Sequence, residues 1–340
     1  MNGYRMKIAS CLVVLLPASV ISSASAWDEN GHATITVLAH EKLPTSMPGW
    51  LRTPEVRARL AYLSAEPDRW RGQRNPDLDH INKPDHYLDV EALEPYGLAL
   101  DRLPRFRRQY TDLLATVRAN HPDRFPKPEK DDDYTRGTPG LLPWSIAELQ
   151  WKIAASWTTL KTYEKHAEYV SDEEMRFARD NVVLHMGLLS HFVGDGAQPL
   201  HLTDHHNGWI GPNPNGYTTS KQFHAFIDGG VIDLHGITTE SLLPRAKAPR
   251  PVSATDYWKD IAVYLGQTHA LVEPLYKLEK SGDLRKEPGR KFIEDRLLEG
   301  GAMLAGVWVA AHDGAVIDDF RVKQLLKRKP ASSVGKAAAP

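Results

Sequence analysis

Apolar residues recur along this chain at the three- and four-residue spacing of amphipathic helices, and alternating strand-like runs are few. The clearest segment is 144–165, whose apolar residues fall on one helical face. Ser171 and Glu174 have the spacing of a capping box, so we expect a second long helix from this point to about Asp195. The pattern predicts a mainly α-helical protein.

Shorter segments repeat the helical pattern, and they are separated by stretches typical of loops. We expect further helices at 33–42, 55–64, 101–119, 223–231, 290–311, and from Ser253 or Thr255 to about Lys280. We expect irregular structure at 66–100, 121–140 and 203–216, which are rich in Pro, Asp, His, Gly or Asn. No internal repeat or clear linker interrupts the chain, so the sequence predicts one multi-helix domain with long loops.

Residues 1–26 have the composition of a secretory signal peptide. Arg5 and Lys7 form a positive start, a mostly apolar stretch follows, and residues 24–26 supply the small-x-small cleavage pattern. Cleavage there leaves Trp27 as the first residue and predicts a secreted or periplasmic protein. No other stretch reaches the ~18 apolar residues of a membrane span.

The composition of the processed chain restricts its chemistry. Cys11, the only cysteine, lies in the signal, so the remainder has no disulfide and no thiolate ligand. A lipobox-like sequence at 8–11 is an alternative for this region, but too little apolar sequence precedes it. Loss of two basic residues changes the formal charge from −1 to about −3, so no basic field exists to bind a polyanion. We expect a catalytic domain at 27–324 and a disordered tail at 325–340.

Two pairs of histidine and aspartate are candidate metal ligands. His191 and Asp195 are four residues apart, and His224 and Asp228 repeat this spacing. On a helix, such residues lie on one face about one turn apart, where they can bind a single ion. An ordinary surface pair is the alternative for each of them, and His201, six residues after Asp195, favours the metal site.

Upstream candidates are His32, Asp68 and His86. All the candidates are imidazoles or carboxylates, which favours zinc, or else manganese or iron, over calcium or magnesium. Several ions close together suit phosphoester hydrolysis, because they hold the attacking and leaving oxygens and make hydroxide available near neutral pH.

The same residues occur in dispersed motifs that resemble those of the three-zinc single-strand-specific nucleases of fungi and plants and their bacterial relatives. The chain is similar, more distantly, to the zinc-dependent bacterial phospholipases C. The matching segments are Trp27-Asp-Glu-Asn-Gly-His32-Ala-Thr, 64–71, His86-Tyr-Leu-Asp89, His191-Phe-Val-Gly-Asp195 followed by Gln198-Pro-Leu-His201, and Phe223-His224 with Asp228. They span most of the processed chain and imply an all-α domain of the phospholipase C/nuclease type around a tri-metal cleft.

The resemblance implies three zinc ions. The first ion would be bound by Asp68, His86, His191 and Asp195. The second would be bound by His201, His224 and Asp228. The third would be bound by the amino group and carbonyl of Trp27, by His32, and by Asp195 as a bridge.

The resemblance also implies two residues that act on the substrate. Arg71 stands where the family has a phosphate-contacting arginine. Asp89 is either a water-orienting carboxylate or a second-shell residue that orients His86. The loop after His201 departs from the family pattern, and Asn207, Asn213 and Asn215 compete for the role of its asparagine. His205 and His206 are extra, and we expect them to be solvated.

The resemblance implies a secreted zinc-dependent endonuclease that acts on single-stranded DNA or RNA and has 3′-nucleotidase activity. A phospholipase C acting on phosphatidylcholine-like lipids is the alternative, although Asp228 favours the nuclease because the phospholipases have a glutamate there. A non-catalytic zinc-binding protein is a third hypothesis. No obligate protein partner is evident. A nuclease needs an aromatic platform for a base, and the candidates are Tyr87, Trp144, Trp209 and Tyr217.

Overall fold

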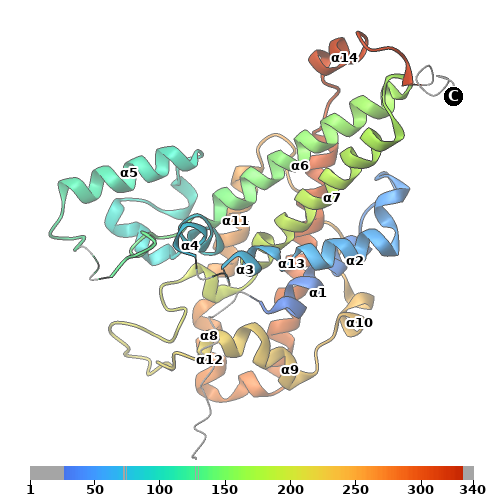
Figure 1. The fold of residues 1–340 in the computed structure, drawn as a ribbon. Coiled ribbons are helices and arrows are strands. Elements are labelled where there is room, and N and C mark those ends of the chain that lie inside the picture. Colours follow the sequence, from blue (N-terminus) through green and yellow to red (C-terminus); the bar gives the residue numbers. More distant parts are fainter. Residues whose placement is uncertain (1–26, 72, 74, 127, 129, 332–340) are drawn as a thin grey trace, which may run out of the picture.

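The computed structural model describes residues 27–331 except 72, 74, 127 and 129, and this part of the chain forms one all-α domain (Figure 1). It contains no β-strand, and its only β-type pairing is an isolated bridge between Leu88 and Gly140. The predicted helical class is therefore confirmed. The predicted signal peptide and residues 332–340 of the predicted tail lie outside the described residues.

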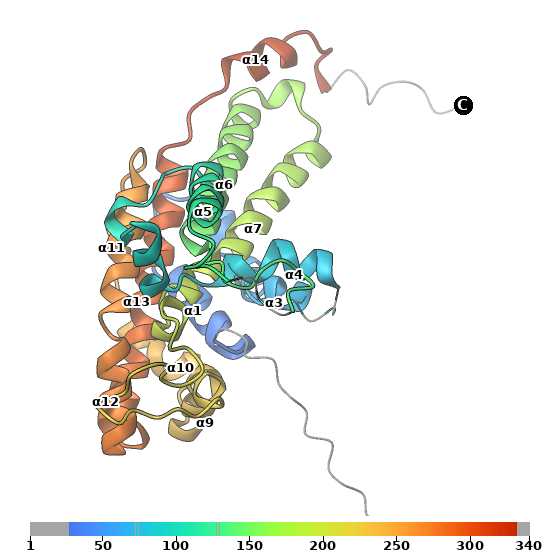
Figure 2. The same cartoon turned by 90° about the vertical axis from the view of Figure 1, so that its left-hand side faces the viewer.

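Five helices build the core of the domain. They are α1 (Glu29–Glu41), α2 (Pro54–Leu63), α6 (Leu142–Lys165), α7 (Asp172–Asp195) and α13 (Glu287–Asp313). The long helices α6 and α7 run side by side, and α13 packs along them and against α1 (Figures 1 and 2). Gly301 of α13 allows the approach to α1, because a Cβ there would lie 2.9 Å from the Leu38 Cβ.

Several predicted helices are confirmed with small shifts of their ends. The capping box of α7 is present, and α7 ends at Asp195 as expected. Helix α1 starts at Glu29 rather than at residue 33, because the Asp28 side chain accepts a hydrogen bond from the Gly31 N–H and caps the helix early. His32 therefore lies inside the first turns of α1. Helix α5 (Arg107–Asn120) begins six residues later than expected.

The prediction of one long helix from Ser253 or Thr255 to about Lys280 is wrong. The chain forms two helices, α11 (Tyr257–His269) and α12 (Val272–Ser281). Pro274 has no N–H to donate and its ring would clash with the carbonyl four residues earlier, so it is tolerated only in the first turn of a new helix. The Ser253 hydroxyl accepts hydrogen bonds from the N–H groups of Thr255 and Asp256 in a turn before α11, rather than capping a helix.

The segment 66–100, expected to be irregular, contains α3 (Glu66–Arg71) and α4 (Pro76–Asn82). Asn75 caps α4 by accepting hydrogen bonds from the Asp77 and Leu78 N–H groups, and Pro76 occupies the first helical position. Three 3-10 turns follow, at Lys83–His86, Val90–Tyr96 and Leu100–Arg102. The described parts of 121–140 and 203–216 contain no helix, as predicted.

The predicted helix at 223–231 is a more complex element. It consists of α8 (Phe223–Ala225), a π-helical turn (Phe226–Gly230) and α9 (Val231–His235). The pattern did not predict α10 (Thr239–Leu242) or α14 (Asp319–Leu325).

The first residues of the expected tail pack on the domain, because Leu325 is buried and Arg328 forms an ion pair with Glu174 at 2.7 Å. Among the described helices, none has the length and hydropathy that crossing a membrane requires.

Candidate metal centre

The first cluster of possible ligands forms where the C-terminal end of α7 meets the 3-10 turn Lys83–His86. His86 Nδ1 lies 2.9 Å from His191 Nε2 and 3.1 Å from Asp195 Oδ2, and His191 Nε2 lies 3.4 Å from the same oxygen. Ligand atoms around one tetrahedral zinc ion are about 3.3 Å apart, given zinc–ligand bonds of about 2 Å. The three atoms therefore have the spacing of ligands that share a metal.

Two more side chains, those of His32 and Asp68, lie next to this cluster. On α1, His32 stacks on His191 with ring centroids 4.0 Å apart, and its Nε2 lies 3.4 Å from Asp195 Oδ1. Asp68 Oδ1 lies 3.8 Å from both His86 Nδ1 and His191 Nε2. The two oxygens of Asp195 thus face different histidines, which is the arrangement of a carboxylate between two ions.

A second cluster contains His201, His224 and Asp228. His224 Nε2 lies 3.4 Å from Asp228 Oδ2, and the rings of His201 and His224 meet edge to face at 4.9 Å. The π-helical turn Phe226–Gly230 presents Asp228. The other Asp228 oxygen accepts a hydrogen bond of 2.8 Å from Gln198 Nε2, and Gln198 is fully buried. We did not predict this role for Gln198, although it lies in the motif that ends at His201.

Backbone carbonyls set the tautomers of two histidines. His191 Nδ1 lies 2.7 Å from the Ser64 carbonyl oxygen, and His201 Nδ1 lies 2.6 Å from that of His86. A carbonyl only accepts, so each Nδ1 carries the proton and each Nε2 keeps a lone pair for a metal. Burial lowers the pKa of His191 to about 3 and that of His201 to about 4, so both rings are neutral at pH 7.

The clusters leave an unusual number of buried polar atoms without hydrogen bonds among the described residues. These atoms are His32 Nδ1 and Nε2, His86 Nε2, Asp195 Oδ1, His201 Nε2, His224 Nδ1 and Nε2, and Asp228 Oδ2. Each unsatisfied group costs about 1–3 kcal/mol. Burial, and then the charge of Asp68, raises the pKa of Asp195 well above its ordinary value, and burial raises that of Asp228. Divalent cations would satisfy these atoms and keep both carboxylates ionised, so the donor set fits metal ions.

Trp27 lies next to both clusters. Its side chain is fully buried, and its Nε1 donates a hydrogen bond of 3.1 Å to the carbonyl of Gly194, the neighbour of Asp195. The Asp28 N–H donates to the Asp228 carbonyl at 3.2 Å. Gly194 is required here, because a Cβ would lie 2.6 Å from His32 Nδ1. The structure thus brings all nine predicted ligand residues into one region.

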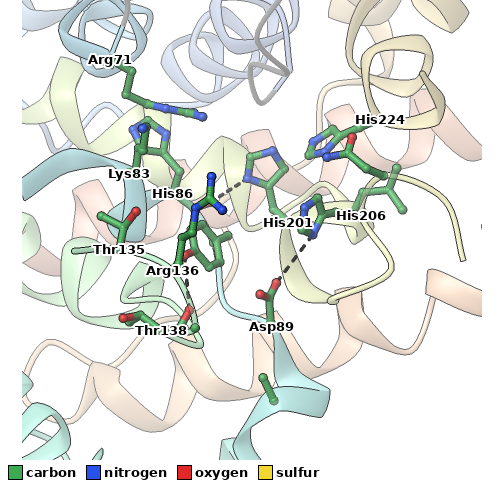
Figure 3. A pocket seen from close by; sticks show the side chains of 15 residues that line it. Arg71, Lys83, His86, Asp89, Thr135, Arg136, Thr138, His201, His206 and His224 are labelled. Atoms are coloured by element: carbon green, nitrogen blue, oxygen red, sulfur yellow. Dashed lines mark hydrogen bonds and ion pairs between the residues drawn. The ribbon is translucent and has the colours of Figure 1, made fainter. Parts of the chain in front are cut away.

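A cavity of about 430 Å³ opens beside the ligands His86, His201 and His224 (Figure 3). Both predicted substrate residues, Arg71 and Asp89, line it. Arg71 Nη1 lies 3.1 Å from Asp68 Oδ1, and Asp89 Oδ1 lies 4.0 Å from His206 Nδ1. Its wall also contains residues that we did not predict, namely Lys83 of the 3-10 turn Lys83–His86 and, from the loop 121–140, Thr135, Arg136, Gly137 and Thr138. These loop residues carry no recognisable motif.

The Asp89 carboxylate forms no hydrogen bond with the His86 ring among the described residues. His86 Nδ1 contacts Asp195 and His191, whereas the Asp89 carboxylate lies 4.0 Å from His206 Nδ1. Burial, together with the charges of Asp204 and Glu91, raises the pKa of Asp89 to about 8. The Asp89 carboxyl group lines the cavity, and its role as a water-orienting carboxylate or as a residue that orients His86 stays a prediction.

The loop after His201 resolves the choice among three asparagines. Asn207 lines the cavity. Asn213 instead exchanges hydrogen bonds with the Tyr217 backbone, and the Asn215 carbonyl accepts from Lys280. Only the first of the three lies at the site.

The expectation that both extra loop histidines are solvated is wrong for His205, whose side chain is 14% exposed, and is confirmed for His206, whose side chain is 42% exposed. His206 lines the cavity. His205 stacks on Trp209 with ring centroids 3.8 Å apart, and its Nδ1 accepts the Ile210 N–H. Both rings are held by neighbouring groups that the linear sequence does not identify.

Of the four candidates for the aromatic platform, one lines the cavity. Tyr87 lines the cavity, whereas Trp144 is buried and stacks on Tyr110. Tyr217 is also buried, and Trp209 packs on His205. Tyr87 is therefore the only one of the four candidates that could meet a base in this cavity.

A third, separate group of possible ligands contains Glu91, Asp204 and His205 and has a different explanation. Glu91 accepts hydrogen bonds from Thr203 Oγ1 at 2.9 Å, the Asp204 N–H at 3.2 Å and His269 Nε2 at 2.9 Å. These bonds use the carboxylate to fasten the loop after His201 to α11. The group is a structural network.

No family model matches this chain. A search of curated proteins also finds no match. The fold and the site define an all-α protein whose buried histidine and aspartate clusters could hold metal ions beside an open cavity.

Proposed function

We propose that this chain is a secreted, zinc-dependent phosphodiesterase of the three-zinc single-strand-specific nuclease type, with 3′-nucleotidase activity. The observation that carries the proposal is the opening of two buried His/Asp clusters onto one cavity with Arg71 in its wall. The all-α domain is the one that this family would require.

The three zinc ions of the proposal use the residues that the clusters contain. Asp68, His86, His191 and Asp195 would bind the first ion, and His201, His224 and Asp228 the second. Trp27, through its amino group and carbonyl, would bind the third with His32 and Asp195. Zinc supplies Lewis-acid stabilisation of phosphoryl oxygens and lowers the pKa of water.

The protein groups around the cavity then bind and orient the substrate. The Arg71 guanidinium has donors in a planar fork and can bind two phosphate oxygens at once. The Asp89 carboxyl group lines the same cavity, where it could orient a water molecule. Tyr87 offers a ring face on the same cavity wall for a base.

The test is hydrolysis by the purified chain 27–340 of single-stranded DNA, RNA, a 3′-nucleotide and phosphatidylcholine, each with and without EDTA. We expect EDTA-sensitive cleavage of the nucleic acids and of the 3′-nucleotide. Cleavage of phosphatidylcholine alone would identify a phospholipase C. Tight zinc binding with no hydrolysis of any substrate would identify a non-catalytic zinc protein.

We also expect the N-terminal residue to control metal content. If the free amine of Trp27 is a ligand, one extra residue before it should reduce bound zinc from three ions to two and lower the rate of single-stranded DNA hydrolysis at least tenfold. Zinc per chain by elemental analysis, with the rate on the same samples, measures both effects. The control is the same extended chain after proteolytic removal of the extra residue. Equal zinc and equal rates in both forms would exclude the amine as a ligand.

A further inference from the structure

One wall of the cavity is formed by residues 135–138 of the loop before α6, and hydrogen bonds join this loop to the segment that carries His86. Lys83 Nζ lies 2.5 Å from Asp133 Oδ2, and the Tyr87 hydroxyl donates to the Thr138 carbonyl at 3.3 Å. The Asp89 N–H donates to the Pro139 carbonyl at 2.6 Å. The backbone of this loop therefore has a defined position relative to the metal ligands.

Three cationic side chains line the cavity, and two of them form ion pairs with carboxylates. Arg71 pairs with Asp68 at 3.1 Å, and Lys83 pairs with Asp79 at 2.9 Å as well as with Asp133. The Arg136 guanidinium has no ion-pair or hydrogen-bond partner among the described residues, although its backbone N–H is held by Asp131 Oδ1 at 3.0 Å. Figure 3 shows the Arg136 side chain among the groups that line the cavity. Arg136 thus offers an uncompensated charge to a ligand.

The cavity is larger than a single phosphate needs. Its volume of about 430 Å³ falls in the range of pockets that bind whole small molecules. Metal ions and Arg71 would neutralise the phosphate that reacts, and they leave Arg136 without a function there. A second phosphate of the same chain would supply an anion for its planar fork of donors.

We infer that Arg136 binds a non-reacting phosphate that flanks the scissile linkage, so that the cavity prefers an oligonucleotide to a substrate with one phosphate. This inference rests on the proposed function. It concerns substrate length and leaves the reacting centre unchanged. Because Arg136 is exposed on a loop, its replacement should not alter the fold.

The first experiment compares Arg136→Gln with the wild type on hexathymidylate and on bis(4-nitrophenyl) phosphate, a diester with one phosphate. We expect kcat/KM to fall about tenfold on the hexamer and to stay within twofold on the small diester. The matched control is Arg124→Gln, which removes the same charge from the same loop at a residue that hydrogen-bonds Pro95 outside the cavity. It should leave both values within twofold.

The second experiment measures binding without turnover. A fluorescein-labelled hexathymidylate in which methylene groups replace the bridging phosphate oxygens keeps its charges but resists hydrolysis. Loss of one phosphate contact should make the slope of log affinity against log salt shallower by about 0.7 in Arg136→Gln and leave it unchanged in Arg124→Gln. Fluorescence anisotropy at several salt concentrations gives the slope.

The outcomes separate this inference from the proposed function. Equal losses on both substrates, or no loss on either, together with an unchanged salt slope, would overturn the role of Arg136. A wild type that hydrolyses neither substrate would contradict the proposed function. In that case the salt slope of Arg136→Gln alone decides whether Arg136 binds a phosphate.

Discussion

Replacing Asp195 with asparagine is expected to remove more zinc and more activity than replacing Asp228 with asparagine. Asp195 is fully buried, with Oδ1 3.4 Å from His32 Nε2 and Oδ2 3.1 Å from His86 Nδ1. If it bridges two ions, asparagine removes the charge that offsets both and turns one ligand atom into a donor. We expect the loss of two zinc ions per chain and a fall in turnover of more than about 100-fold, beyond what an outer-shell change produces.

Asp228→Asn is the matched control because it makes the same chemical change at a buried ligand of one ion. One Asp228 oxygen already accepts a hydrogen bond from Gln198, which leaves a single oxygen facing His224. We expect the loss of one ion and a smaller fall in turnover. Elemental analysis and single-stranded DNA hydrolysis on the same samples measure both quantities, and circular dichroism checks that α7 is retained. Full zinc content with near-normal turnover in Asp195→Asn would refute the bridge.

Removal of metal is expected to destabilise the whole domain. The ligand clusters join α1, α3, the turn before Leu88, α7 and the turn that presents Asp228, and the chain has no cysteine after Cys11 to cross-link these elements. Ions that bind only the folded state add about 4 kcal/mol per site when their concentration is a thousand times the Kd. For a domain of this size we expect EDTA to lower the Tm by about 10 °C or more.

Thermal unfolding followed by circular dichroism tests this effect. EDTA already saturated with zinc is the control for the chelator itself, and added zinc should restore the Tm after chelation. Asp195→Asn, which should have lost part of its zinc, is expected to respond less to EDTA than the wild type. A Tm that does not move with free EDTA would show that the clusters do not hold ions that link these elements.

Local sequence was sufficient to predict the helical core. The apolar face of α6 and the capping box at Ser171 depend on residues within a few positions of one another, so both could be identified without the structure. The same local rule applies to the ligand pairs. His191 and Asp195 had to share a face once α7 was helical, because four residues make about one turn.

Only the tertiary structure showed how these pairs meet residues far away in the chain. The proton on His201 Nδ1 is held by the carbonyl of His86, 115 residues earlier, and Trp27 contacts Gly194 across 167 residues. No periodic pattern encodes such contacts, because they depend on how whole helices pack. The unpaired buried nitrogens and oxygens of the clusters likewise became visible only after burial was known.

The loops mark the limit of prediction from this sequence. The choice of Asn207 over Asn213 and Asn215 and the placement of Arg136 in the cavity wall both depend on hydrogen bonds between loops and distant segments. The break between α11 and α12, in contrast to the loops, has a local cause. Pro274 marks it in the sequence, but the continuous apolar pattern favoured one long helix. The sequence by itself therefore determined the long helices of the core and the chemistry of the ligand pairs. Packing decided which loop residues face that chemistry, because loop conformation follows from long-range contacts rather than from local periodicity.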